Sequence, residues 1–316
     1  MIETGLFEAA LIDPVIKKGA RELWIVSGYA TPAMVNYHFE ELSKRGVFEN
    51  IKIRLIVGMP SKVGISRIAH YGFLDLISGR FECRYVYRGA PVHSNAYLWF
   101  DADEAFIGSA NYTQSAFKST CREILTFVNP VLVAQYYSKV LADSLPCNSP
   151  DLKGKIKIHG SRPRREGSMT VCEDHTDFSS FDTTGLEKVS ISLLDRNGNV
   201  PERSGLNWGQ RPGRDHNQAY LAIRRTECTH GFFPTQGQHV TLLTDDGCIL
   251  DANIAQQAGK AIHTTNNALL GQYFRSRLGL GDGKPVTKDA LAAYGRYKVD
   301  LYKFDDESYF MDFNND

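Results

Sequence analysis

The chain has 316 residues, which is long for one ordinary compact domain and favours two. Hydrophobic residues make up 42% and charged residues 23% of it, as in ordinary soluble globular proteins. The formal net charge is zero and the pI is about 7.1, which excludes a global basic field, so any surface for nucleic acid must be local.

The cysteine pattern and the apolar runs bear on the cellular compartment. Six cysteines are scattered without paired spacing, which favours reduced thiols over disulfides or a zinc site. The residues after Met1 show no signal-peptide pattern, and no apolar run approaches the roughly 18 residues that span a bilayer. We therefore expect a cytoplasmic protein without membrane anchorage.

The first half of the chain alternates between strand-like and helix-like segments. Residues 31–44 and 65–77 have the periodicity of helices, the first of which begins at Thr31 and Pro32. Apolar runs typical of buried strands occur at 22–29, 51–58 and 81–87. This alternation predicts an α/β layer with helices over a central sheet, and binding residues where strand ends and loops converge.

A chemically distinctive stretch runs from Val92 to Thr113. A β-rich run places His93 at one end, and a short acidic turn at Asp101 reverses the chain. A second apolar run then brings Ser109 and Asn111 back towards the same end. One imidazole, one hydroxyl and one carboxamide are therefore expected to meet where they suit a phosphate.

This spacing resembles the phospholipase D superfamily, whose signature is His-x-Lys, an aspartate, and Gly-Ser-x-x-Asn or Gly-Ser-x-Asn. The matching positions are His93, Asp101, Gly108, Ser109 and Asn111, whereas Asn95 stands where the family has its lysine. The resemblance implies that His93 attacks phosphorus to form a phosphohistidine, and that a second histidine protonates the leaving oxygen. Because the chain shows one such motif, the second histidine would come from a twofold-related subunit of a homodimer.

Two further positions bear on this expected chemistry. Asn95 carries no charge and is shorter than lysine, and losing one preorganised donor typically costs about 2.7–4 kcal/mol. We therefore expect a chain that binds DNA and cuts poorly or not at all. Glu123 stands where the family has a carboxylate that orients the nucleophilic histidine, although a surface acid near a strand start is the alternative. No acidic cluster of the magnesium-binding kind occurs in the motif, so no metal or other cofactor is expected.

Residues 130–145 read as an amphipathic helix whose apolar face suits core or dimer packing better than a ligand site. Composition shifts after this helix, and a basic cluster follows at 162–165. That cluster either touches the DNA backbone or is a solvated charge run. The expected divisions are a nuclease and dimerisation domain at 1–150, a linker at 151–174 and a DNA-recognition domain at 175–316.

The second half has a different pattern. Short β-patterned runs separated by turn clusters predict a mainly-β barrel or pseudobarrel. These runs lie at 189–194, 218–223, 239–243 and 298–304.

Arginines and amides concentrate in two candidate arms of this half. The segment 203–225 holds five arginines against one acid, and arginine reads guanine while Asn or Gln reads adenine in the major groove. A second arm at 256–267, continued through 271–279, offers cations for phosphates. The alternative is that Arg275 and Arg277 pair with local acids such as Asp282 and that Trp208 belongs to the core. The expected DNA-binding residues are Arg203, Asn207, Trp208, Gln210, Arg211, Arg214, Asn217, Gln218, Lys260, Asn267, Arg275 and Arg277.

Both halves together resemble the NgoFVII-type restriction endonucleases. The resemblance rests on segments 93–99, 108–111, 204–211 and 269–275. It implies an α/β phospholipase D-like domain, with a mixed sheet flanked by helices, followed by a mainly-β pseudobarrel related to the plant B-three domain. The implied activity is metal-independent, site-specific cleavage of double-stranded DNA by a homodimer, in restriction-modification and host defence.

Other functions and partners stay open at this point. One is a cleavage-inactive DNA-binding protein that uses its nuclease domain only for dimerisation. Another is a phosphatidyl-transferring enzyme, which the arginine and amide loops disfavour. Some family members act with a separate ATP-driven translocase subunit. This chain has no Gly-x-x-x-x-Gly-Lys loop, so such energy use would come from another chain.

Overall fold

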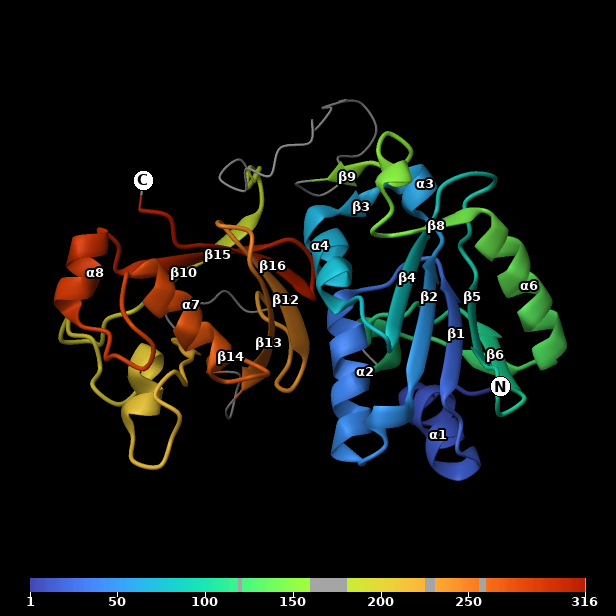
Figure 1. Ribbon diagram of the computed structural model, residues 1–316, viewed down its shortest axis with the longest axis horizontal. Coiled ribbons are helices and arrows are strands. Elements are labelled where there is room, and N and C mark those ends of the chain that lie inside the picture. The colour runs from blue at the N-terminus through green and yellow to red at the C-terminus, as the bar shows by residue number, and fades with distance from the viewer. Residues whose placement is uncertain (119–120, 160–180, 225–230, 256–259, 316) are drawn as a thin grey trace. The chain divides into compact units, whose positions relative to one another are not determined.

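The computed structural model describes residues 1–118, 121–159, 181–224, 231–255 and 260–315. The chain forms two compact units, Met1–Cys172 and Glu173–Asp316, whose elements are labelled in Figure 1. Within the described ranges, every helix is too short or too polar to cross a lipid bilayer.

Unit 1 is built on a seven-stranded mixed sheet of order β7-β6-β5-β1-β2-β4-β8. Three central strands, β1, β2 and β4, run parallel, and the remaining pairs are antiparallel. The strands are β1 (Glu22–Ser27), β2 (Lys52–Val57), β4 (Phe81–Val86), β5 (Asn95–Trp99), β6 (Glu104–Gly108), β7 (Leu125–Phe127) and β8 (Ser144–Pro146). A separate pair is formed by β3 (Ile65–Ser66) and β9 (Ile158–His159).

Helices cover both faces of this sheet, as Figure 1 shows. The helices at the N-terminus pack on one face of the sheet together with α2 and α4, and α6 packs on the other face. Alternation along β1 directs this layering, because Leu23 and Ile25 enter the first core while Val26 packs under α6. The helices are η1 (Glu8–Ile12), α1 (Asp13–Lys18), α2 (Pro32–Lys44), η2 (Phe48–Asn50), α3 (Pro60–Val63), α4 (Arg67–Leu76), α5 (Gln114–Phe117), α6 (Pro130–Ala142) and η3 (Pro150–Leu152).

The two long helices begin where the sequence predicts. Thr31 caps α2 by accepting the Met34 N–H at 3.2 Å, and Asn129 caps α6 by accepting the Val131 N–H at 2.9 Å. A proline follows each cap at the first helical position, where its missing N–H costs nothing.

The expected linker begins inside unit 1. η3 occupies 150–152, and Ile158 of β9 pairs with Ile65 of β3. This part of the 151–174 segment is therefore folded with unit 1. Residues 160–180, with the basic cluster at 162–165, lie outside the described residues.

Unit 2 is a seven-stranded sheet of order β10-β15-β16-β12-β13-β14-β11. All its pairs are antiparallel except β12 with β16, and the two end strands β10 and β11 approach each other. The sheet is thus nearly closed, and the predicted pseudobarrel is confirmed. Its strands are β10 (Glu187–Ser192), β11 (Leu221–Ala222), β12 (His239–Thr244), β13 (Ile249–Ala255), β14 (Ala261–Thr264), β15 (Lys298–Lys303) and β16 (Ser308–Asp312).

Among the residues of unit 2 that the structure describes, the helical segments are η5 (Gly205–Gln210), α7 (Leu269–Arg277) and α8 (Lys288–Tyr294). They correct the expectation of a second arm over 256–279. Residues 261–264 form strand β14 and residues 269–277 form α7, because Ile262, Leu270 and Phe274 are fully buried in the barrel core. Residues 256–259 lie outside the described residues.

A fully buried histidine, His38, lies in the core of unit 1. Its Nδ1 lies 2.9 Å from the Tyr112 hydroxyl and its Nε2 lies 3.2 Å from the Leu11 carbonyl oxygen. Burial lowers the pKa of His38 to about 4, against a smaller opposing effect of the Leu11 hydrogen bond.

Acid is therefore expected to destabilise unit 1 through His38. Below pH 6.5 the unfolded chain binds a proton that folded His38 takes up only near pH 4. The stability present above pH 6.5 is thus lost as pH falls, by about 3 kcal/mol over this window. Urea denaturation from pH 7.5 to 4.5 measures the slope, and His38→Gln should flatten it. An identical slope in the variant would contradict this origin.

Candidate active site and DNA-binding surface

The β5–β6 hairpin gathers the predicted phosphodiester-site residues at one end of unit 1. Asn95 at the start of β5 pairs with Gly108 at the end of β6. His93 lies two residues before β5, and Asn111 lies three residues after β6. β1 pairs with β5, so its carboxyl end at Ser27 reaches the same place.

Asn95 is buried in this junction, with 3% of its surface exposed. Its Oδ1 accepts hydrogen bonds from the Ser27 hydroxyl at 2.9 Å and the Gly28 N–H at 3.1 Å. Its Nδ2 donates to the Ser109 carbonyl oxygen at 2.8 Å. The protein itself thus engages both ends of the buried carboxamide, and the expected hydrogen bond from Asn95 to phosphate stays a prediction.

Asn111 is oriented by the backbone of Tyr29. Its Oδ1 accepts the Tyr29 N–H at 3.0 Å, so its Nδ2 faces the opposite way. Within the described residues, no acceptor binds this Nδ2. Asn111 therefore keeps amide hydrogens that can be donated to a ligand.

Ser109 and Glu123 form a hydrogen-bonded pair. The Ser109 hydroxyl donates to the Glu123 carboxylate and accepts the Ile124 N–H at 3.1 Å. The preceding Gly108 has no room for a side chain, because a Cβ would lie 2.0 Å from the Ile124 carbonyl oxygen. The structure thus joins Glu123 to Ser109, and its expected role in orienting His93 stays a prediction.

The side chain of His93 is exposed, whereas its backbone is packed against neighbouring residues. Its backbone packs against Gly28, where an added Cβ would lie 3.2 Å from the His93 Cα. The rings of His93 and Tyr29 meet at 85° with centroids 5.7 Å apart. The Val92 N–H donates to the Gly58 carbonyl at 3.1 Å. The backbone of His93 is therefore held in place, while its imidazole is open to solvent.

Sequence reasoning missed Ser27, Gly28 and Tyr29, which end the first buried strand. The available signal was that the ends of neighbouring strands converge at such sites. Asp101, by contrast, lies at the opposite end of the sheet, where it accepts the backbone N–H groups of Arg21 and Glu22. It holds the start of β1 and is not part of the site. Over the described ranges, no three His, Cys, Asp or Glu side chains are grouped to hold a metal ion.

In unit 2, amides of the predicted first arm fold this segment against the loop before α8. Asn207 is buried, donates to the Val286 carbonyl at 2.8 Å and accepts the Val286 N–H at 2.8 Å. Asn217 accepts the Gly283 N–H at 2.8 Å, and Gln210 donates to the Gly283 carbonyl at 3.0 Å. This corrects the expectation that these amides read bases, because their polar groups shape the loop.

The same segment exposes a cationic surface, which we call the arginine-loop surface. Its members are Arg203, Trp208, Arg211, Arg214 and Gln218. The Arg214 guanidinium lies 4.1 Å from the centroid of the Trp208 ring and donates to the Gln218 Oε1 at 2.9 Å. Stacking of this kind holds the planar donor fork in one orientation.

Arg275 is fully buried, which corrects the expectation of a phosphate contact. It donates to the backbone carbonyls of Lys284 at 2.7 Å, Gly271 at 3.1 Å and Leu206 at 3.3 Å. A guanidinium satisfied in this way joins α7 to two loops and cannot reach DNA.

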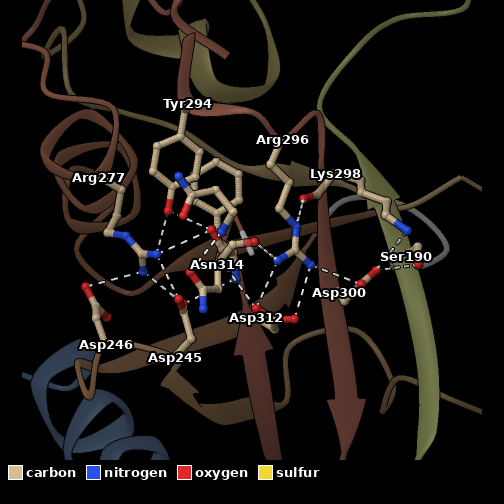
Figure 2. A network of polar contacts seen from close by, with 12 residues as sticks. Ser190, Asp245, Asp246, Arg277, Tyr294, Arg296, Lys298, Asp300, Asp312 and Asn314 are labelled. Carbon is tan, nitrogen blue, oxygen red and sulfur yellow. Dashed lines mark hydrogen bonds and ion pairs between the residues drawn. The ribbon is translucent and has the colours of Figure 1, made fainter. Parts of the chain in front are cut away.

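Arg277 lies in an interior network of charged side chains (Figure 2). It donates to both carboxylate oxygens of Asp245 at 2.9 and 2.8 Å and to the Tyr294 hydroxyl at 2.6 Å. The expected phosphate contact is therefore wrong for Arg277, and the alternative of a local acid is observed, with Asp245 in place of Asp282. Arg296 extends the network to neighbouring strands.

Two predicted residues keep their status as predictions. Lys260 is exposed at the start of β14, beside residues 256–259. Asn267 is half-buried, and its backbone carbonyl accepts the Ala219 N–H at 3.1 Å.

Comparison with protein families covers both units. The family model of the NgoFVII restriction endonuclease N-terminal PLD domain matches residues 4–154. The model of the NgoFVII C-terminal B3-like DNA-binding domain matches residues 182–305. The chain belongs to the NgoFVII-type restriction endonucleases. Unit 1 of this NgoFVII-type chain is its phospholipase D-like nuclease domain, and unit 2 is its B3-like DNA-binding domain.

Solved structures similar to this NgoFVII-type chain include two small proteins. NucT from Helicobacter pylori is 18% identical with a TM-score of 0.32, over 46% of this chain and 96% of that one. Nuc from Salmonella typhimurium, a phospholipase D family member, is 12% identical with a TM-score of 0.31, over 40% and 82%. A comparison with curated proteins gave no match.

Proposed function

We propose that the protein is a sequence-specific DNA endonuclease in which unit 1 cleaves and unit 2 selects the site. The observation that carries the proposal is that exposed His93 and Asn111 both lie against Gly28 and Tyr29, in a chain that also has a B3-like DNA-binding domain. The protein would act in the cytoplasm, where it would be the restriction component of a host-defence system. An ATP-driven translocase, where one takes part, would be a separate chain.

The proposed chemistry proceeds through a covalent intermediate. An imidazole nitrogen of His93 attacks phosphorus, the bond to the leaving oxygen breaks, and a phosphohistidine forms. The imidazolium of a second His93 gives its proton to the leaving oxygen, and then accepts one from the water that hydrolyses the intermediate. Asn111 donates amide hydrogens to the non-bridging oxygens as charge develops on them. Neither a metal ion nor another cofactor takes part in these steps.

Apolar surface beside the site supports a second copy of the chain as the source of the second histidine. Ile107 is 39% exposed two residues before Ser109, and Ile124 is 45% exposed directly after Glu123. Phe127 extends this apolar edge along β7. Exposed apolar side chains that adjoin polar site residues are typical of an interface, and pairing of two such edges would bring both sites together.

Ile124→Asp is expected to convert dimers into monomers that no longer cleave. A buried interface residue of this kind is worth about 2 kcal/mol or more, so the dimer dissociation constant should rise at least about 30-fold. Analytical ultracentrifugation measures the change. Ile16→Asp is the matched control, because Ile16 is similarly exposed on α1. Equal dimerisation of both variants, or a monomeric parent chain, would contradict the shared site.

Arg214→Ala is expected to weaken specific DNA binding and to relax the sequence preference. A well-placed arginine fork contributes about 1–3 kcal/mol of base discrimination, which corresponds to about 5- to 150-fold in affinity. Gel shifts at stated salt, with DNA selected from a random library, give the ratio of specific to non-specific binding. Arg88→Ala is the control, since Arg88 is an exposed arginine of unit 1 paired with Asp143. An unchanged preference in Arg214→Ala would remove Arg214 from base reading.

The proposal is tested on DNA that the protein itself selects. The full chain is incubated with selected DNA and with scrambled DNA, with EDTA in excess over any metal ion. Slow cleavage at a fixed position in the selected DNA is the expected result, because Asn95 lacks the charge of the family's lysine. Binding without cleavage, even after long incubation, would overturn the endonuclease proposal.

That second outcome describes the other candidate function, a cleavage-inactive DNA-binding protein that uses unit 1 for dimerisation. Asn95 favours it, because the charge of the family's lysine is missing and the carboxamide is engaged within the protein. The incubation with selected DNA separates the two functions.

A further inference from the structure

We propose that Asn95 is a positioning residue that fixes the strand ends supporting His93 and Glu123, and that unit 1 is built around asparagine at this position. The structural part of this inference stands on contacts within unit 1. Its consequence for catalysis rests on the proposed function.

The groups around Asn95 match the two ends of a carboxamide. The Gly28 N–H and the Ser27 hydroxyl face Oδ1, while the Ser109 carbonyl faces Nδ2. The Ser27 hydroxyl also lies 2.6 Å from the Tyr29 carbonyl oxygen, so the Gly28 N–H is the donor that depends most on Oδ1. A lysine ammonium only donates, and it would leave this buried N–H without an acceptor.

Asn95 acts on His93 through Gly28. Its Oδ1 holds the Gly28 N–H, and Gly28 packs so closely that a Cβ there would lie 3.3 Å from the His93 carbonyl oxygen. The next residue, Tyr29, gives its N–H to Asn111 and its ring to His93. Because His93 lies outside strand β5, these contacts fix its place.

The other end of the carboxamide acts on Glu123. Nδ2 holds the Ser109 carbonyl, and the hydroxyl of the same serine binds the Glu123 carboxylate. The Ser109 N–H also donates to the Ile124 carbonyl at 3.1 Å. One side chain thus ties the end of β1 to β5 and to the Ser109–Glu123 pair.

Three variants separate positioning from phosphate contact. Asn95→Asp keeps the acceptor for Gly28 and removes the donor to Ser109. Asn95→Lys removes the acceptor and supplies the family's charge. Asn111→Asp is the matched control, because it removes the amide hydrogens expected to contact phosphate and keeps both the acceptor for the Tyr29 N–H and the Asn95 contacts.

The measurements use the full chain and bis(4-nitrophenyl) phosphate, a phosphodiester that needs no recognition sequence. Thermal unfolding gives stability, steady-state kinetics give kcat and KM, and histidine side-chain NMR follows the His93 imidazole. Asn95→Asp should lower kcat about 10- to 100-fold well below its unfolding temperature, as loss of a supporting residue does, with little change in KM. The His93 resonances should shift in the same variant. Asn95→Lys should unfold at lower temperature than the parent without a gain in kcat, whereas Asn111→Asp should retain the parent's unfolding temperature because it keeps the acceptor for Tyr29.

Opposite results would overturn the inference. Asn95→Lys that unfolds at the parent's temperature and raises kcat about 100-fold or more would show that the site lacks only a charge. Should neither parent nor variants hydrolyse the probe, the proposed nuclease function fails, while unfolding temperatures and His93 resonances still decide the role of Asn95. Unchanged unfolding and unchanged resonances would then refute positioning.

Discussion

His93→Gln should abolish DNA cleavage and leave DNA binding intact. The exposed imidazole lies at the meeting point of β1, β5 and β6, and glutamine cannot form the phosphohistidine. Removing the nucleophile of a covalent enzyme costs about 10⁴- to 10⁶-fold in kcat. Single-turnover cleavage of selected DNA measures the loss.

Two controls show whether His93→Gln affects the chemical step alone or also affects DNA binding and folding. Gel-shift affinity for the same DNA should equal that of the parent, because the B3-like domain is unchanged. The unfolding temperature should also stay the same, because the His93 side chain is exposed. Cleavage by His93→Gln at the parent rate would show that another group attacks phosphorus.

Arg275→Ala should destabilise unit 2, because Arg275 is fully buried and does not reach DNA. The substitution removes the guanidinium donor from the carbonyls of Lys284, Gly271 and Leu206, the last two of which lie in buried hydrogen bonds, and also opens a cavity. Unsatisfied buried groups cost about 1–3 kcal/mol each, so the free energy of unfolding should fall by at least about 3 kcal/mol. Urea denaturation followed by near-ultraviolet circular dichroism measures the loss.

Arg211→Ala is the matched control for Arg275→Ala. Arg211 is exposed on the arginine-loop surface, so its loss should change DNA affinity and leave the urea midpoint within experimental error. The opposite pattern, in which Arg275→Ala folds like the parent and loses DNA affinity, would restore Arg275 as a DNA contact.

The hairpin of unit 1 was predictable, whereas the role of Asn95 was not. The apolar runs at 95–99 and 104–108 and the turn between them determine which strand ends meet, so His93, Ser109 and Asn111 come to the same end of the sheet. The burial of Asn95 depends on a partner, Ser27, that lies 68 residues earlier in the chain. A local pattern carries no information on such a contact, and a lysine or an asparagine fits the strand equally well.

The burial of Arg275 in unit 2 likewise depends on contacts that are distant in the sequence. Arg275 lies on α7, and one of its acceptors, the Leu206 carbonyl, is 69 residues away in the chain. A charged residue in a helix is normally exposed, so composition alone placed it on the surface. The sequence analysis named no strand at 249–255, where β13 lies. Residues 249–255 alternate between half-buried and buried positions, a pattern that sequence reasoning can detect.

The central claim is that two copies of the chain bring two imidazoles to one phosphorus atom. A crystal structure of the full chain bound to its selected DNA tests this claim most directly. The account predicts a twofold dimer in which both His93 side chains flank a single phosphate, with Ile124 buried between the copies. Two His93 side chains far apart and facing away from each other would contradict it.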